Sequence, residues 1–238
     1  MSLRKPRRGK ISAWFSVKKA HAAQLKASKR IIRQDMLPKE IRYVAAVDIA
    51  YTSELSIGAA AVLDYDSLSL VESKIAHVKT EFPYIPTLLS FREIPPAVAV
   101  TKKLSLQPDV FLVDGQGIMH PYRFGFASHL GLVLSMPTIG VAKSPLIGEV
   151  GEFNEENWTP ITDKKEVVGV ALIAKKGKKP VYVSIGHMVS LKRAIAIVKH
   201  CTPRYRISKP IRLAHSIAAY EKRKVQNSEL SMRELSDA

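Results

Sequence analysis

Apolar and polar positions follow one another along the first half of the chain in patterns that predict a β-sheet. The run "YVAAVDIAY" at residues 43–51 is apolar apart from its aspartate, which predicts a strand. Residues 57–65 and 68–79 follow as two further β-type runs joined by turn residues, so the three runs predict an antiparallel meander. The run "PDVFLVDG" at residues 108–115 is almost continuously apolar, as is typical of a strand inside a parallel sheet.

Helical patterns surround these strands. Residues 13–33 predict a basic amphipathic helix, and residues 87–92 predict a short helical piece. Pro95 and Pro96 then open a second helix that ends near Leu104, because proline is tolerated in the first turn of a helix and disrupts its interior. Further helices are expected at residues 126–134, 191–199 and 210–224, and further strands at residues 138–143, 166–174 and 180–186.

The order of these elements predicts a single α/β domain over residues 1–238, since no internal repeat or low-complexity linker divides the chain. Three antiparallel strands followed by α/β units predict an RNase H-like fold, with a mixed central sheet flanked by helices. Residues 1–34 form its basic N-terminal helical segment, and residues 225–238 are expected to be a frayed tail. The acidic stretch at residues 149–165 has no pattern to which we assign a role.

Composition points to a protein of the reducing cytoplasm. The chain has one cysteine, Cys201, which excludes an intramolecular disulfide and a cysteine-based zinc site. No apolar stretch reaches the roughly 18 residues of a membrane span. The first 34 residues lack the hydrophobic region of a secretory signal, and we interpret their basic pattern as a helix of the mature protein in preference to a transit peptide.

Charge is distributed unevenly. The formal net charge is +16, which suggests a polyanionic partner such as nucleic acid. Residues 1–34 and residues 167–220 each contain 11 lysines and arginines and no acid, whereas residues 35–166 contain 17 acids and 11 bases. Basic flanks around an acidic centre favour a metal-dependent nuclease, because such an enzyme needs cations for phosphate and carboxylates for the metal. An ordinary solvated basic surface remains the simpler alternative.

Two aspartates stand where apolar residues are expected. Asp48 interrupts an uncharged strand, and Asp114 ends another. A buried carboxylate is costly without hydrogen-bond donors or a cation, and we favour a cation here. Adjacent parallel strands lie about 4.8 Å apart, so carboxylates at the same height could share one Mg²⁺. A helix cap or an Asx turn is the alternative for each aspartate taken alone.

Other candidate residues have structural alternatives as well. Glu93 is expected at the end of a short helix, where the helix dipole disfavours an anion, although pairing with Arg92 would also explain it. His215 lies among apolar neighbours and could be a buried core residue or a ligand. The stretch "FPYIP" holds Tyr84 in a stiff loop, which suits a wedge between bases and equally suits simple packing of the loop.

Several of these stretches resemble the endonuclease V family, the deoxyinosine-directed endonucleases. The similar blocks span residues 44–220 in the family's order and are "VAAVDIAY", "FPYIPTLLSFRE", "FLVDGQGIMHPYRFGFASHLGLVLSMPTIGVAKS", "VSIGHMVSL" and "PIRLAHSIAAY". The resemblance implies hydrolysis of an inosine-containing strand at the second phosphodiester on the 3′ side, leaving a 3′-hydroxyl and a 5′-phosphate. It also implies that Mg²⁺ is the cofactor, with Mn²⁺ as a substitute.

The resemblance further implies a role for each matching position. Asp48 and Asp114 would be direct metal ligands, and Glu93 would be the third acid. His215 would orient or activate water, and Lys143 would contact the phosphate. The implied substrate-binding residues are Tyr84 as the wedge, and Ile85, Leu89, Gly115, Gly117 and His120 around the flipped base.

We therefore predict a monomeric repair endonuclease acting on DNA that contains deoxyinosine. Two alternatives remain open, namely an endoribonuclease for inosine-containing RNA and a non-catalytic nucleic-acid-binding protein. Gln116 stands where some family members carry histidine or asparagine, so the sequence does not give its role.

Overall fold

The computed structural model describes residues 16–236, so the expected helix start at residues 13–15 lies outside the described residues. The described residues form a single α/β domain built on a nine-stranded sheet of order β3-β2-β1-β4-β5-β9-β8-β7-β6. The strands are β1 (Tyr43–Tyr51), β2 (Leu55–Asp64), β3 (Leu70–Lys79), β4 (Val110–Asp114), β5 (Thr138–Ala142), β6 (Glu149–Val150), β7 (Trp158–Asp163), β8 (Glu166–Leu172) and β9 (Val181–His187).

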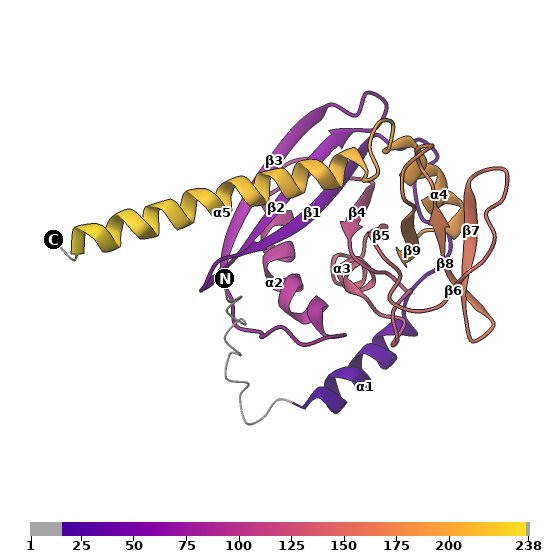
Figure 1. Ribbon diagram of the computed structural model, residues 1–238, viewed down its shortest axis with the longest axis horizontal. Helices are drawn as coiled ribbons and strands as arrows, with labels where there is room; N and C mark the ends of the chain where they lie inside the picture. Colours follow the sequence, from indigo (N-terminus) through magenta and orange to yellow (C-terminus); the bar gives the residue numbers. More distant parts are fainter. Residues whose placement is uncertain (1–15, 237–238) are drawn as a thin grey trace.

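Helices cover both faces of the sheet (Figure 1). α2 (Leu89–Thr101) and α3 (Phe126–Leu134) pack on one face, and α4 (Leu191–His200) and α5 (Lys209–Ser236) pack on the other. α1 (Val17–Ser28) precedes the sheet and lies against the segments that follow β3 and β4. Figure 1 shows α5 crossing β1 and β2 and continuing beyond the edge of the sheet.

The sheet has the predicted mixed topology. β1, β2 and β3 form an antiparallel meander, and β4 and β5 extend it as parallel strands, which is the expected RNase H-like arrangement. In β1, Val44 and Ala46 pack in the core with α4 and α5, whereas Ala45 and Val47 pack in the core with α2 and α3. Burial on both faces explains why the run is continuously apolar. The next side chain on the α5 face is that of Asp48.

The predicted break between two helices at residues 93–95 is wrong. α2 is one helix from Leu89 to Thr101, with Pro95 and Pro96 in its interior. Proline in a helix interior removes a backbone hydrogen-bond donor and costs about 3 kcal/mol. For this reason a proline in the sequence is interpreted as the start of a new helix. Tertiary packing offsets this cost, because Ala97 and Val100 are fully buried against the sheet.

Two other expectations need correction. The acidic stretch at residues 149–165 forms β6 and β7, which continue the sheet beyond β8. The helix expected at residues 210–224 extends to Ser236, through most of the segment that we expected to be a frayed tail. Among the described residues, no helix is both long and apolar enough to cross a membrane.

Gly58 lets α2 lie directly on β2. A Cβ atom at this position would lie 2.4 Å from the Pro96 carbonyl oxygen, which is backbone and cannot rotate away. We expect Gly58→Ala to lower the free energy of unfolding by about 1–3 kcal/mol, as overpacking typically does. Urea unfolding measures this loss. The matched control is Gly115→Ala, whose Cβ would lie 3.4 Å from its nearest neighbour; equal losses in both variants would contradict the close contact.

Candidate active site

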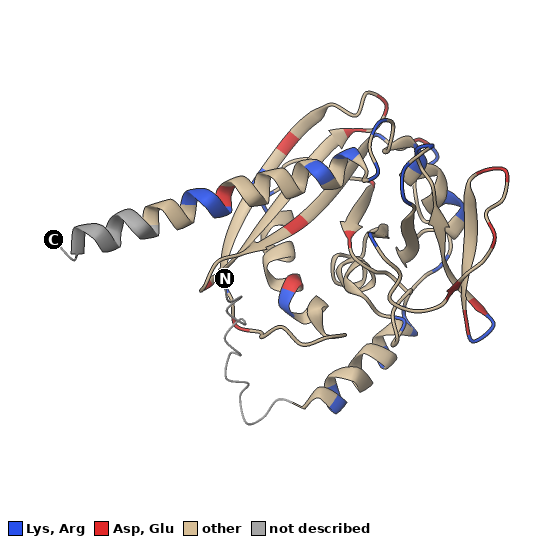
Figure 2. Cartoon of the chain, viewed as in Figure 1, with Lys and Arg blue, Asp and Glu red and all other residues tan. Residues whose placement is uncertain are grey.

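Asp48 and Asp114 lie side by side at the point where the pairing of β1 with β4 ends. Val47 of β1 pairs with Val113 of β4, so the register places the two aspartates at the same height. Side chains alternate between the two faces of a strand, and the residues two positions before the aspartates, Ala46 and Leu112, pack in the core on the α5 face. Both aspartate side chains therefore point to that face. The side chains are 18% and 20% exposed, so each carboxylate is largely removed from water. Figure 2 shows acidic positions on β1, at the end of β4 and on α2 in the central part of the molecule.

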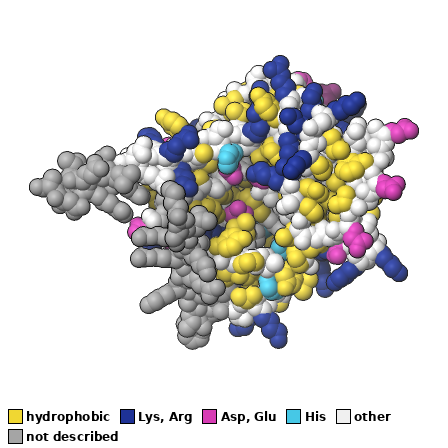
Figure 3. Space-filling model, viewed as in Figure 1, with side chains coloured by type: hydrophobic (Ala, Val, Ile, Leu, Met, Phe, Trp, Pro, Cys, Tyr) yellow, Lys and Arg dark blue, Asp and Glu magenta, His cyan; other side chains and the backbone are white. Residues whose placement is uncertain are grey.

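A nitrogen group compensates each aspartate. Nδ1 of His215, on α5, lies 2.9 Å from an Asp48 carboxylate oxygen. The Lys143 ammonium, directly after β5, donates to Asp114 across 2.8 Å. In Figure 3, a histidine lies beside acidic side chains at a hollow in this face of the molecule. The Lys143 ammonium thus compensates Asp114 in this arrangement, whereas the cation that we expected beside Asp114 is a divalent metal ion, which stays a prediction.

Glu93 is the third carboxylate, and it comes from the helix on the other face of the sheet. Burial, followed by the negative charges of Asp48 and Asp114, raises the pKa of Glu93 to about 8, while Arg92 acts in the opposite direction. Burial also raises the pKa of Asp48, with Asp114 adding to the effect and His215 opposing it. The aspartates therefore lie close enough to Glu93 to disfavour its ionisation, and Asp114 lies close enough to Asp48 to have the same effect there.

The expected position of Glu93 at the end of a short helix is wrong. It lies in the second turn of α2, beyond the first turn to which the effect of the helix dipole is confined. Its raised pKa therefore results from burial and from the two neighbouring aspartates.

The chemistry of these donors suits a hard divalent cation, because Mg²⁺ and Mn²⁺ prefer carboxylate oxygens. Within residues 16–236, however, no group of three or more histidine, cysteine, aspartate or glutamate side chains has the geometry of a metal site. His215 and Lys143 each engage one aspartate oxygen in this arrangement.

The turn after β4 is fixed by its neighbours. The Gly117 amide donates to the Ser184 hydroxyl across 2.9 Å, and a Cβ at Gly117 would lie 2.0 Å from the Ile185 carbonyl oxygen. The Gln116 side-chain amide donates to the Ser144 carbonyl across 2.9 Å. Gln116 thus ties the turn to the segment that follows Lys143, which gives this position a structural role.

Tyr84 lies in the loop between β3 and α2 and is 64% exposed, as a wedge requires. Pro83 and Pro86 flank it and stiffen the loop. Leu89 begins α2 and is four residues before Glu93, so the two side chains lie on the same side of the helix. The expected base-binding residues Leu89 and Gly115 therefore adjoin the carboxylates.

His120, in the segment after β4, and His129, on α3, are both largely buried. Burial lowers the pKa of His120 to about 4, and a backbone hydrogen bond with Thr87 opposes the shift. His120 therefore lies against the Tyr84 loop as a neutral imidazole. Burial likewise lowers the pKa of His129 to about 4, and His129 bonds the Ser90 hydroxyl at 3.1 Å, so it is a structural residue of the α2–α3 contact.

α1 holds the Tyr84 loop through contacts that no local sequence pattern indicates. Gln24, which is 1% exposed, donates to the carbonyl oxygens of Thr87 at 2.9 Å and Phe124 at 3.2 Å. His21 bonds the Thr87 hydroxyl at 2.9 Å. Thr87 has a φ of +69°, an uncommon conformation for a β-branched residue, so these bonds stabilise a strained end of the loop.

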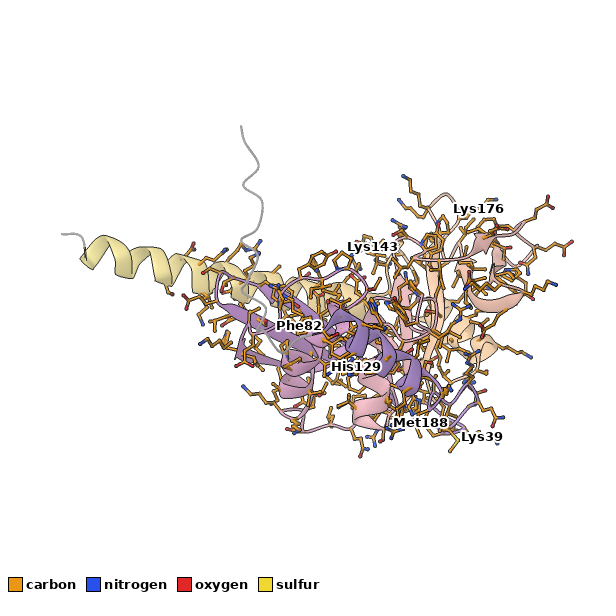
Figure 4. All side chains as sticks on the ribbon, turned by 90° about the horizontal axis from the view of Figure 1, so that it is seen from below. Lys39, Phe82, His129, Lys143, Lys176 and Met188 are labelled. Atoms are coloured by element: carbon orange, nitrogen blue, oxygen red, sulfur yellow. The ribbon has the colours of Figure 1, made fainter. Side chains whose placement is uncertain are left out.

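Arg206 is a second residue that sequence reasoning missed. Its guanidinium donates to the backbone carbonyls of Lys143 at 2.5 Å and Pro180 at 2.8 Å. These bonds fix the end of β5 and therefore the position from which Lys143 reaches Asp114. Figure 4 shows Lys143 on the same side of the molecule as Lys176 and opposite Lys39 and Met188.

The raised pKa of Glu93 predicts a pH-dependent stability of the metal-free protein. Its pKa rises from the ordinary 4.5 to about 8 on folding, so folding takes up a proton between these values and stability falls as pH increases through this window. We expect Glu93→Gln to remove this loss, which amounts to at most about 1.4 kcal/mol per pH unit. Urea unfolding in EDTA should show the variant to be more stable than the parent at pH 8 and similar at pH 4.5. Parallel stability curves would contradict this.

The contacts of Gln24 predict that α1 controls the mobility of the Tyr84 loop. Gln24→Leu removes two buried hydrogen bonds, and we expect local opening of residues 81–88 to become about tenfold more favourable, since such bonds contribute about 1 kcal/mol each. Amide hydrogen exchange measures this. Gln34→Leu, at an exposed position, is the control and should leave the loop unchanged. Equal exchange in both variants would show that α1 does not restrain the loop.

Known proteins are similar to this chain in sequence and in fold. A family model described as Endonuclease V matches residues 25–216. Endonuclease V of Thermofilum pendens is 42% identical over 222 residues, which cover 92% of this chain and 95% of that protein. Endonuclease V of Rippkaea orientalis is 45% identical over 218 residues, covering 88% and 95%.

Solved structures agree. Endonuclease V of Streptomyces avermitilis has a TM-score of 0.84 at 36% identity and covers 91% of this chain and 97% of its own. Ciona intestinalis endonuclease V, solved with a 24mer DNA containing an inosine followed by a ribo-adenosine, has a TM-score of 0.78 at 35% identity and covers 88% and 98%. Because the family model matches most of the chain and the relatives align over nearly their full length, this chain belongs to the endonuclease V family.

Proposed function

We propose that this nuclease recognises deoxyinosine in DNA and hydrolyses the second phosphodiester bond on its 3′ side. Its family membership makes it a hydrolase of phosphodiester bonds. The observation that supports the proposal most directly is the set of three mutually interacting carboxylates, Asp48, Glu93 and Asp114, with Lys143 and His215 beside them. The Ciona relative, which was solved with inosine-containing DNA, supports the choice of substrate.

Hydrolysis transfers the phosphorus from the 3′-oxygen to a water oxygen, leaving a 3′-hydroxyl and a 5′-phosphate. Asp48, Asp114 and Glu93 would hold Mg²⁺ or Mn²⁺, which when bound polarises the phosphate and activates water. His215 is held by Asp48 and would orient the attacking water and accept its proton. Lys143, once released from Asp114, would place its ammonium against the negative charge that grows on the phosphate.

Recognition of the base would depend on the segments beside the carboxylates. Tyr84 would insert into the base stack from its stiff, exposed loop, with Ile85 and Leu89 packing against the opened nucleotide. The backbone amide of Gly115 would read the hypoxanthine edge, because a residue without a side chain lets a base approach closely. The role in base binding that we expected for Gly117 does not fit the structure, because its amide donates to Ser184 and the residue packs against the Ile185 carbonyl. His120 supports the loop from behind as a buried neutral imidazole.

Inosine-containing RNA is the second candidate substrate. In the DNA bound to the Ciona relative, a ribo-adenosine follows the inosine, so a family member accommodates a 2′-hydroxyl at that position. A non-catalytic binding protein is disfavoured by the family membership of the chain. We further propose that the protein acts in the cytoplasm as a monomer.

The reaction can be tested on an end-labelled DNA duplex with one deoxyinosine. We expect a single nick one nucleotide beyond the lesion in Mg²⁺ and none in EDTA. Asp114→Asn should lower the rate at least about a hundredfold, because it removes a charge from the proposed metal site. Asp66→Asn, at an exposed turn position, is the matched control and should cut normally.

Full activity of the Asp114→Asn protein would contradict the proposed roles of the carboxylates. If the parent protein binds the duplex without cutting it but cuts the corresponding inosine RNA, the ribonuclease assignment replaces the DNA one.

A further inference from the structure

A basic cavity of about 370 Å³ lies between the turn that joins β2 to β3 and the segment that joins α4 to α5. Arg204, Lys209 and Arg212 line it together with Tyr205, and no acidic residue lines it. None of these three cations takes part in an ion pair with another described residue. Three uncompensated positive charges around one cavity repel one another, so the cavity is electrostatically suited to an anion.

The geometry of the lining favours a phosphate group. The Arg212 guanidinium is held over the Tyr205 ring at 3.7 Å, and its buried Nε lacks a hydrogen-bond partner in the described part of the chain. A planar guanidinium held in this way presents paired donors to phosphate oxygens. Lys209 begins α5, a helix of 28 residues, so the positive end of the helix dipole adds to the charge of the side chains.

The cavity lies beside the candidate active site. Arg212 and His215 are three residues apart on α5, so their side chains are neighbours about 5–6 Å apart, and His215 contacts Asp48. Figure 3 shows lysine and arginine side chains gathered near the start of α5, next to the histidine and acidic side chains at the hollow. A strand whose scissile phosphate lies at the carboxylates would therefore carry a neighbouring phosphate to this cavity.

We propose that the cavity binds a non-scissile backbone phosphate of the nucleic-acid strand, with Arg204, Lys209 and Arg212 as its ligands. The bound phosphate fixes the register of the strand relative to the carboxylates. It therefore helps to determine which phosphodiester bond is cut. One helical turn is about 5.4 Å and one nucleotide advances about 3.4 Å, so the anchor lies within about three nucleotides of the scissile phosphate. This assignment rests on the proposed function.

The test neutralises one phosphate at a time. A single methylphosphonate is placed at each position from three nucleotides before to three nucleotides after the expected cut in a deoxyinosine duplex, and binding is measured in EDTA. The parent protein should lose at least about fivefold in affinity at one non-scissile position. Lys209→Gln and Arg204→Gln should shrink that loss below about twofold and leave the losses at other positions unchanged.

Lys102→Gln is the matched control, because it removes one positive charge from an exposed residue after α2 and outside the cavity. It should behave as the parent does at every position. Each cavity variant should also lower the slope of log affinity against log salt by about 0.9, the value for one lost phosphate contact. Equal losses in the parent and in both cavity variants at every position would overturn the proposal.

A second arm separates a backbone phosphate from a terminal one. A 5′-phosphate on a product-length strand could tighten binding to the parent and not to Lys209→Gln, while no internal methylphosphonate changes the affinity. In that case the cavity binds product ends and the proposal is wrong. Because the assay measures binding without turnover, it also separates the two proposals. The parent protein could fail to cut deoxyinosine DNA and still lose affinity at one non-scissile position in a way that depends on Lys209 and Arg204. That result would contradict the proposed reaction and leave the phosphate site standing.

Discussion

The structure of the site depends on the cost of holding three carboxylates together with little water. Asp48 and Asp114 lie at the same height on neighbouring parallel strands, and Glu93 reaches them from α2. The charges of Asp48 and Asp114 raise the pKa of Glu93, and the charge of Asp114 raises that of Asp48, so the chain surrounds the carboxylates with positive or hydrogen-bonding groups from separate elements. His215 on α5 and Lys143 after β5 supply this compensation, and a divalent cation would take it over.

This requirement explains why the site lies where the two helical layers meet. The aspartates point to the face covered by α4 and α5, whereas Glu93 comes from the face covered by α2 and α3. Side chains from both layers approach one another where the pairing of β1 with β4 ends, at the carboxyl end of β4. Rigid supports then fix each contributor, with Arg206 holding the backbone at Lys143 and Gln116 holding the turn after Asp114.

The loop that would recognise the base is held by fewer contacts than the carboxylates are. The Tyr84 loop is exposed, and at Thr87 it adopts a strained conformation that hydrogen bonds from Gln24 and His21 stabilise. A loop held by a few bonds at one end can open at low cost, which suits a wedge that must enter a base stack. The rigid carboxylate cluster and the adjustable loop meet on α2, where Leu89 precedes Glu93 by one turn.

The sequence by itself determined the strands, the mixed topology, the family and the two strand-borne aspartates. These features depend on local patterns, because an apolar run buried on both faces and a charge within it are visible without knowledge of distant contacts. The tertiary structure alone decided that α2 continues through Pro95 and Pro96, since packing against Gly58 and the sheet outweighs the local preference of proline. It also decided the partners of Gln24 and Arg206 and the cavity around Lys209, because each joins segments far apart in the chain that no local pattern connects.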